Sequence, residues 1–264
     1  YFTIFTALIK SMKMESLPAK KDRSKSKDLQ KDIKEASLVE IDSLNSKMMS
    51  VLLTGVNRAF PFAKLESTVF DDHLNTLFQI CHLASFNTTI QALTLIFQVQ
   101  TIKKEFSDRF YRVLYDSLFD RRLHDASKQA MYLNLVYRAL KSDDSIPRIR
   151  AFVKRLCQSI SIANVPLICG SLFLLSELFN QTPSLWTIVT EKEIKLNDNE
   201  MYDGKKRDPR YANADRSLLW ELIPFTNHFH PTVSLYAKTI LSGNSLVVPK
   251  DATNYDPLLN HTLT

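Results

Sequence analysis

Few side chains in this sequence have the types and the spacing that catalysis or metal binding requires. His228 and His230 lie two residues apart and would both be able to bind a metal ion, but no cysteine or carboxylate pair lies close to them in the sequence. Cys81 directly precedes His82, and adjacent residues of a helix do not face each other, so the two do not form a catalytic thiol–imidazole pair. We therefore expect neither a metal site nor nucleophilic catalysis.

The glycine content argues against the common phosphate-binding loops. The chain has only 4 glycines, all isolated, whereas the nucleotide P-loop and the dinucleotide fingerprint each need several within a few residues. Kinase, ATPase and dehydrogenase activities are excluded together. We expect a protein that is not an enzyme and that binds no cofactor.

The remaining candidate sites are basic surfaces that would contact nucleic acid or a partner protein. In the segment that begins at Pro147, four cations lie opposite the apolar stripe with no acid between them: Arg148, Arg150, Lys154 and Arg155. Such a face would bind phosphates. An ordinary solvated helix face explains the pattern equally well.

A second basic segment, DGKKRDPRYANA, combines cations with an aromatic ring: Lys205, Lys206, Arg207, Arg210 and Tyr211. Basic groups beside a ring that can stack are typical of sites for single-stranded RNA. Asp203 and Asp208 dilute the charge, and the same segment would also be explained as a polar loop that docks on the helical body. We expect RNA or protein contact here and keep the docking interpretation open.

Residues 15–46 form a third basic segment with few apolar residues, which predicts a solvated linker. Its cations, which include Lys20, Lys21, Arg23 and Lys25, would serve as a nuclear-localisation signal or as RNA contacts, or belong to a plain linker. Residues 1–14 precede it with an apolar run too short to span a bilayer, so we expect no membrane association and interpret this run as the last helix of a truncated N-terminal part.

Three consecutive amphipathic helices are predicted between Glu105 and Cys157 from apolar residues recurring at intervals of three and four. Their stripes are Phe106, Phe110, Val113, Leu114 and Leu118; Ala130, Leu133, Tyr137 and Leu140; and Ile149, Phe152, Val153 and Leu156. Asp125 or Ser127 is expected to cap the second helix, and Asp144 or Ser145 the third. Tyr111 and Tyr115 are expected in the core, where aromatic rows usually lie; if exposed, they would form a ridge that binds a partner.

Further helices are predicted on both sides of these three. One begins at Lys47 and ends before Pro61, one covers about 68–84, and one is capped by Asn87. An apolar segment from Pro166 is expected to be enclosed by its neighbours, and two more helices cover about 213–229 and 231–242. Helix follows helix over residues 47–264 with few glycines for β-turns, so we predict an all-α fold: either an α-solenoid of HEAT/ARM-like helix pairs or a compact bundle.

Charge and cysteine content fit a helical protein of a reducing compartment with an anionic partner. The net charge is +6 and the pI about 9.1, a mild basic excess. The 3 cysteines are odd in number and widely spaced, each among apolar residues, which predicts buried thiols rather than disulfides.

Several ordered strings resemble the CCAAT-binding-factor (CBF) family of nucleolar ribosome-assembly proteins, and in particular its large-subunit branch. They are LLTGVNRAFPFA, NTTIQALTLIFQ, SDRFYRVLYDSL, SKQAMYLNLVYRALK, RIRAFVKRL, PLICGSLFLLSEL, YDGKKRDPRYANADRSLLWEL and HFHPTVSLYAKTIL, and they extend from about residue 51 to the end. The sequence departs from the family at Arg121, where proline is common, which predicts a looser turn at this point. The family continues beyond the last residue of this chain, so we expect the C-terminal end to be incomplete.

The resemblance implies a non-enzymatic nucleolar factor of early large (60S) subunit assembly. Its implied partners are a second nucleolar complex protein in a heterodimer, pre-ribosomal RNA, other early assembly factors and ribosomal proteins. One alternative is a DNA-binding transcription factor at CCAAT-box promoters, although the sequence has no zipper, zinc finger or helix-turn-helix. The other is a transport adaptor that binds only proteins.

Overall fold

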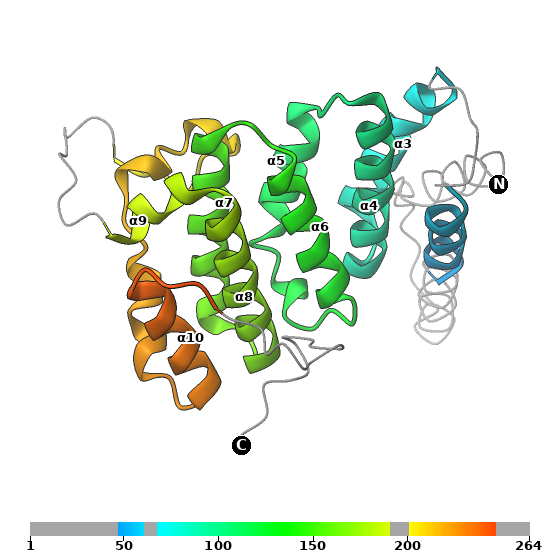
Figure 1. The fold of residues 1–264 in the computed structure, drawn as a ribbon. Helices are drawn as coiled ribbons and strands as arrows, with labels where there is room; N and C mark the ends of the chain where they lie inside the picture. Colours follow the sequence, from blue (N-terminus) through cyan, green and yellow to red (C-terminus); the bar gives the residue numbers. More distant parts are fainter. Residues whose placement is uncertain (1–46, 61–67, 191–200, 247–264) are drawn as a thin grey trace, which may run out of the picture. The chain divides into compact units, whose positions relative to one another are not determined.

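A computed structural model describes residues 47–60, 68–190 and 201–246 of the chain (Figure 1). This part is all-helical, as predicted: it consists of α-helices, 3₁₀ turns and connecting loops, and none of its residues lies in a strand. It falls into two compact units, with the boundary between Phe106 and Ser107. The predictions for residues 1–14 and 15–46, with the candidate contacts Lys20, Lys21, Arg23 and Lys25, lie outside the described residues.

The first unit contains a helix of residues 47–59, α3 (Thr68–Leu83) and α4 (Phe86–Lys103). Helix α4 is buried on nearly all sides, and its predicted apolar residues are all in the core: Ile90, Leu93, Ile96 and Phe97. A buried polar residue of α4, Gln91, accepts a hydrogen bond from Ser50 Oγ (3.1 Å) and donates one to Thr54 Oγ1 (2.6 Å). The helix of residues 47–59 is thereby joined to α4 by polar contacts that fix its register.

Two predicted helix caps are wrong. Helix α4 begins after Ser85, and Asn87 lies inside its first turn rather than at the cap. Helix α6 (Gln129–Lys141) begins after Lys128, later than either predicted cap, Asp125 or Ser127. The side-chain amide of Gln129 donates to the carbonyls of Leu123 (3.0 Å) and His124 (2.8 Å). These bonds hold the turn before α6 outside the helix.

The second unit contains the remaining helices. They are α5 (Asp108–Ser117), α6 (Gln129–Lys141), α7 (Ile146–Ser159), α8 (Val165–Gln181), the short α9 (Thr187–Thr190) and α10 (Pro231–Leu241). Helices α6 and α7 both pack against α8, which is buried nearly all round, as its apolar sequence predicts (Figure 1). Helix α7 begins after Ser145, one of its two predicted caps, but the Ser145 side chain makes no capping bond.

The buried faces follow the predicted stripes on α7, and mostly on α5, but not on all of α6. Tyr111 and Tyr115 on α5 lie in the core, which confirms the core interpretation of this pair. On α6, Ala130 is exposed and Tyr132 is buried instead. The Tyr132 hydroxyl lies 2.8 Å from Ser117 Oγ of α5, and this buried contact turns the inner face of α6 away from the predicted stripe.

The connection between α5 and α6 keeps an ordered turn in spite of Arg121. Residues Arg121–Leu123 form a 3₁₀ turn, and the carboxylate of Asp120 accepts the backbone N–H of Arg122 (3.0 Å). An aspartate cap supplies the order that the family's proline would otherwise give.

The predicted helix over about 213–229 does not form. Three 3₁₀ turns take its place: Ala214–Arg216, Trp220–Leu222 and Pro224–Asn227. The backbone of Asn213 is left-handed (φ 53°) and Ser217 is extended, so the helical hydrogen-bond ladder is broken twice. Helix α10 ends as predicted, with Gly243 at φ 77° just beyond it.

Candidate interaction surface

Residues 201–222, called here the docked segment, lie against α5 and α7 and are held by the cations of α7. Arg155 is 3% exposed, and its guanidinium donates to the carbonyls of Gly204 (2.7 Å) and Lys206 (3.2 Å) in this segment. It also donates to the carbonyl of Tyr115 (3.1 Å) and lies 3.3 Å from the centre of that ring. One arginine therefore joins α7, α5 and the docked segment.

Lys154, also 3% exposed, holds a later part of the docked segment. Its ammonium group donates to the carbonyl of Leu218 and to Glu221 Oε2 (2.8 Å). Gln158, one turn further along α7, donates to the other oxygen of Glu221 (3.0 Å) and accepts from the hydroxyl of Tyr202 (3.2 Å). Both ends of the docked segment are thus fixed to the same helix face.

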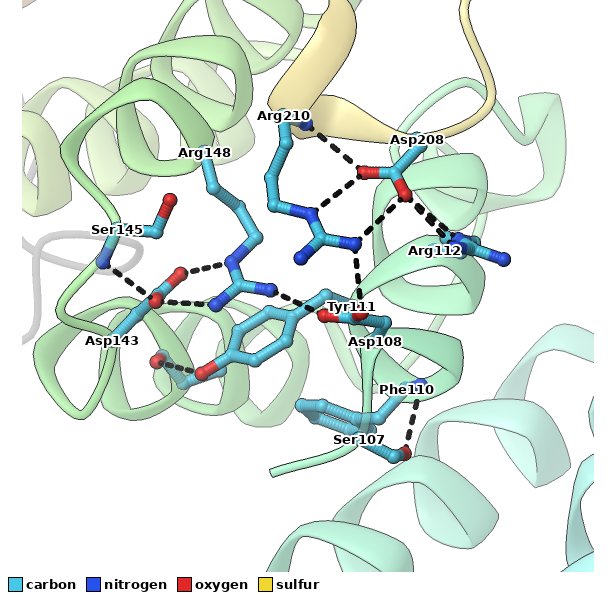
Figure 2. A network of polar contacts seen from close by, with 11 residues as sticks. Ser107, Asp108, Phe110, Tyr111, Arg112, Asp143, Ser145, Arg148, Asp208 and Arg210 are labelled. Carbon is cyan, nitrogen blue, oxygen red and sulfur yellow. Dashed lines mark hydrogen bonds and ion pairs between the residues drawn. The ribbon is translucent and has the colours of Figure 1, made fainter. Parts of the chain in front are cut away.

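Figure 2 shows the polar network at the start of α7. Arg148 donates to both oxygens of Asp143, and its Nη1 lies 3.1 Å from Asp108 Oδ1 of α5. Its guanidinium carbon is 3.9 Å from the centre of the Tyr111 ring. Burial lowers the pKa of Arg148, but the hydrogen bonds and negative charges of its carboxylate partners raise this pKa by more than burial lowers it. The net shift is therefore upward.

The docked segment joins this network through Asp208 and Arg210 (Figure 2). Arg210 Nη2 lies 2.7 Å from Asp108 Oδ2 and 3.3 Å from Asp208 Oδ2, and Arg112 of α5 lies 2.9 Å from Asp208 Oδ2. Burial raises the pKa of Asp208, but hydrogen bonds from the two arginines outweigh burial and leave this pKa below its ordinary value. Asp208 does not merely dilute the charge of the segment; it is one of the groups that dock it.

The sequence predicted an exposed, phosphate-binding cationic face on α7, and the structure shows that these cations are not free at the surface. The fourth cation, Arg150, donates to the carbonyl of Ser184 (3.2 Å) and to Thr187 Oγ1 (2.9 Å). All four cationic head groups, of Arg148, Arg150, Lys154 and Arg155, bind groups of the same chain. Residues 201–222 bind Lys154 and Arg155, whereas Arg150 binds residues 184–187 and Arg148 binds two aspartates. Helical periodicity carries no information about such distant partners.

The basic residues of the docked segment itself remain accessible. Residues 203–212 form a loop closed at its base by a hydrogen bond from the backbone N–H of Asp203 to the carbonyl of Ala212 (3.0 Å). Lys205, Lys206 and Arg207 are exposed at its tip, and Tyr211 is 65% exposed. Within the described residues, neither lysine side chain makes a hydrogen bond or ion pair, whereas Arg207 lies 3.4 Å from Asp116. The loop docks on the helical body, as one of the two interpretations expected, and RNA or protein contact at its exposed cations stays a prediction.

Sequence reasoning missed Phe119, which follows α5 and is 48% exposed. Its ring centre lies 4.6 Å from the guanidinium carbon of Arg155, so it borders the loop 203–212. It follows Leu118, the last residue of the predicted α5 stripe, and lies beyond the end of α5 at Ser117, where helical periodicity no longer predicts which side chains are buried.

No group of three or more His, Cys, Asp or Glu among the described residues is placed to hold a metal ion. The backbone N–H of His230 donates to Nδ1 of His228 (3.1 Å), and burial lowers the pKa of His228. All three cysteines are buried and outside any disulfide, as predicted. Within the described part, no helix has the length and apolar character needed to cross a bilayer.

Comparison with known proteins gives a consistent family. The model of the CBF/Mak21 family matches residues 89–237, more than half of the chain. The ribosome biogenesis protein NOC1 of Chaetomium thermophilum is 39% identical and covers 100% of this chain, which spans 28% of that relative. CCAAT/enhancer-binding protein zeta of Homo sapiens is 35% identical, with 85% of this chain and 27% of the relative covered.

A more distant relative belongs to the same group. The nucleolar complex protein 4 homolog of Rattus norvegicus is 31% identical, with 58% of this chain and 29% of the relative covered. The chain spans less than a third of the length of these three relatives. The resemblance indicated by the sequence strings is confirmed, and the chain belongs to the CBF/Mak21 family, a family of nucleolar complex and ribosome biogenesis proteins.

Proposed function

We propose that this chain is the helical scaffold of a non-enzymatic nucleolar factor that assembles early precursors of the large (60S) ribosomal subunit. Its contact with pre-ribosomal RNA is made by the exposed tip of the loop 203–212. The observation that carries this proposal is the pair of unneutralised lysines, Lys205 and Lys206, on a loop whose backbone is held by the buried guanidinium of Arg155.

A loop that is fixed before binding loses little conformational freedom when it binds. Lysine side chains at its tip attract phosphates without reading base sequence, which suits a scaffold that positions RNA rather than selecting a site. Of the remaining predicted contacts, Arg207 and Tyr211 are accessible for this role. Arg155 and Arg210 act from behind the surface by holding the loop. The other cations of α7 bind groups outside the loop.

The protein partners follow from the family. We infer a second nucleolar complex protein as heterodimeric partner, with early assembly factors and ribosomal proteins around it, because the relatives are named as nucleolar complex and ribosome biogenesis proteins. Successive helix pairs of the HEAT/ARM type, stacked into an α-solenoid, would offer the extended surface that several simultaneous partners need.

The test is ultraviolet crosslinking of the tagged full-length protein in cells, with both RNA and DNA sequenced. We expect clustered reads in large-subunit pre-rRNA. Replacing Lys205, Lys206 and Arg207 by alanine is expected to reduce these reads, whereas alanine at three exposed lysines elsewhere, Lys47, Lys141 and Lys238, removes the same charge without this loss.

Two outcomes would contradict the proposal. Reads at promoter DNA with rRNA at background would favour a transcription factor. The absence of both RNA and DNA reads would favour an adaptor that binds only proteins. Charge reversal on α7 is unsuitable for this test, because reversing Lys154 or Arg155 would place a like charge in a buried contact and disrupt the fold.

A further inference from the structure

Phe119 lies beside the basic tip of the loop 203–212, and one arginine ties the two together. The guanidinium of Arg155 lies over the Phe119 ring, 4.6 Å from its centre, and donates to the carbonyl of Lys206 (3.2 Å). Because Arg155 is 3% exposed and Phe119 is 48% exposed, the ring forms the outer layer of this stack. An apolar ring is thus held at the surface by a buried cation.

The surroundings of the ring carry positive charge from the loop tip. The same guanidinium binds the carbonyls on both sides of Lys205, those of Gly204 and Lys206, so it fixes the backbone from which the two lysines extend. Asp116 lies 3.4 Å from Arg207 and 3.6 Å from Arg155, and Asp120, which directly follows Phe119, lies 2.6 Å from Arg122, so both carboxylates have cationic partners.

We propose that Phe119, with Lys205 and Lys206, forms a subsite for single-stranded RNA, in which one base stacks on the Phe119 ring and the adjoining phosphates contact the lysines. This inference rests on the proposed RNA-scaffold function and names the chemistry of its contact. It favours unpaired RNA because only an unstacked base can present its face to a protein ring.

Arg155 also fixes the position of the Phe119 ring. A guanidinium over one face of an aromatic ring is attracted by its π electrons and keeps the ring in place. The opposite face is then presented without side-chain reordering, and stacking is tolerant of sequence because every base has a π face. A general RNA scaffold requires such a contact, whereas base-edge readout would require hydrogen-bonding groups around the ring.

The experiment measures binding of full-length protein to a fluorescein-labelled oligouridylate of about 12 nucleotides, within the range of single-strand site sizes, at several salt concentrations. The variants are Phe119→Leu, which keeps apolar bulk against Arg155 but removes the aromatic face, and Phe119→Trp, which keeps that face. Phe229→Leu is the matched control, because Phe229 is 84% exposed and precedes α10. Lys205→Ala/Lys206→Ala tests the phosphate contacts.

We expect Phe119→Leu to weaken binding by about 5- to 150-fold, the range for loss of one base–aromatic stack, without changing the salt dependence. Phe119→Trp and Phe229→Leu should bind like the wild type. The double lysine variant should reduce the slope of log K against log salt by about 1.4, two contacts at about 0.7 each.

The outcomes separate this inference from the proposed function. Wild-type protein that binds RNA while Phe119→Leu binds equally well would overturn the subsite and leave the scaffold function standing. Wild-type protein that binds no RNA would overturn both. If, in addition, an Asp/Glu-rich peptide binds the wild type and loses affinity in Phe119→Leu, the surface is a protein-binding site. Unchanged melting and circular dichroism of Phe119→Leu would assign its loss to the ring.

Discussion

Replacing Arg155 by methionine is the sharpest test of how the docked segment is held. The guanidinium supplies three hydrogen bonds to main-chain carbonyls and lies against two aromatic rings. Methionine fills a similar length of apolar space but donates nothing. The buried carbonyl of Tyr115 would then lose its charged donor, and the carbonyls of Gly204 and Lys206 would lose the group that binds the loop to α7.

The expected magnitude follows from these contacts. A hydrogen bond from a charged donor is worth about 1.5–3 kcal/mol, and the two loop carbonyls recover part of this from water. A desolvated cation–π contact adds about 2 kcal/mol. The free energy that opposes opening of residues 201–212 should therefore fall by about 3–5 kcal/mol, or to zero if docking is worth less than this.

Hydrogen–deuterium exchange of the full-length protein, read by mass spectrometry, measures this opening. Peptides from 201–212 should exchange about 100-fold faster or more in Arg155→Met. Arg112→Met is the control, because the Arg112 side chain is 46% exposed and a surface ion pair is worth about 0–1 kcal/mol. Equal protection of the loop in wild type and Arg155→Met would refute the argument that this arginine holds it.

Three further outcomes are expected. Lys154→Met should destabilise the second unit by about 2–3 kcal/mol, because it leaves Glu221 without its cation. Adding Glu221→Gln in a double-mutant cycle should recover part of this loss. Strictly additive effects of the two substitutions would contradict a coupling between these side chains. The pKa of Asp208 is lowered below its ordinary 3.8, so the stability that this carboxylate contributes is complete above pH 3.8 and is lost as pH falls through the lowered pKa. Asp208→Asn should therefore weaken the dependence of the free energy of unfolding on pH in the acid range. Burial raises the pKa of Cys157, and that of Cys169 to about 11, so a thiol reagent at pH 8 should modify either only upon unfolding; rapid labelling of native protein would show that they are accessible.

The three central helices could be predicted because they depend on local patterns. Apolar residues at intervals of three and four give each helix one face for the core, and the structure buries the expected residues on α7: Ile149, Phe152, Val153 and Leu156. Helix ends were less predictable. An aspartate, asparagine or serine is available at many positions, and which one begins a helix depends on contacts such as that of Gln129 with the preceding turn.

The candidate site shows the limit of local reasoning most clearly. The sequence alone identified Arg148, Arg150, Lys154 and Arg155 as four cations with no acid between them, and identified Lys205, Lys206, Arg207, Arg210 and Tyr211 as a basic segment with a ring. It could not show that the two sets meet, because a contact such as that of Arg155 with the carbonyl of Lys206 joins residues 51 positions apart.

Composition, helical periodicity and the ordered family strings determined by themselves that this is an all-helical member of the CBF/Mak21 family with a mild basic excess. Only the tertiary structure decided which cations are accessible. A buried cation needs partners that replace water, and Arg155 finds them in carbonyls that the chain brings back from residues 204 and 206. Lys205, between those carbonyls, is thereby turned outward to the solvent.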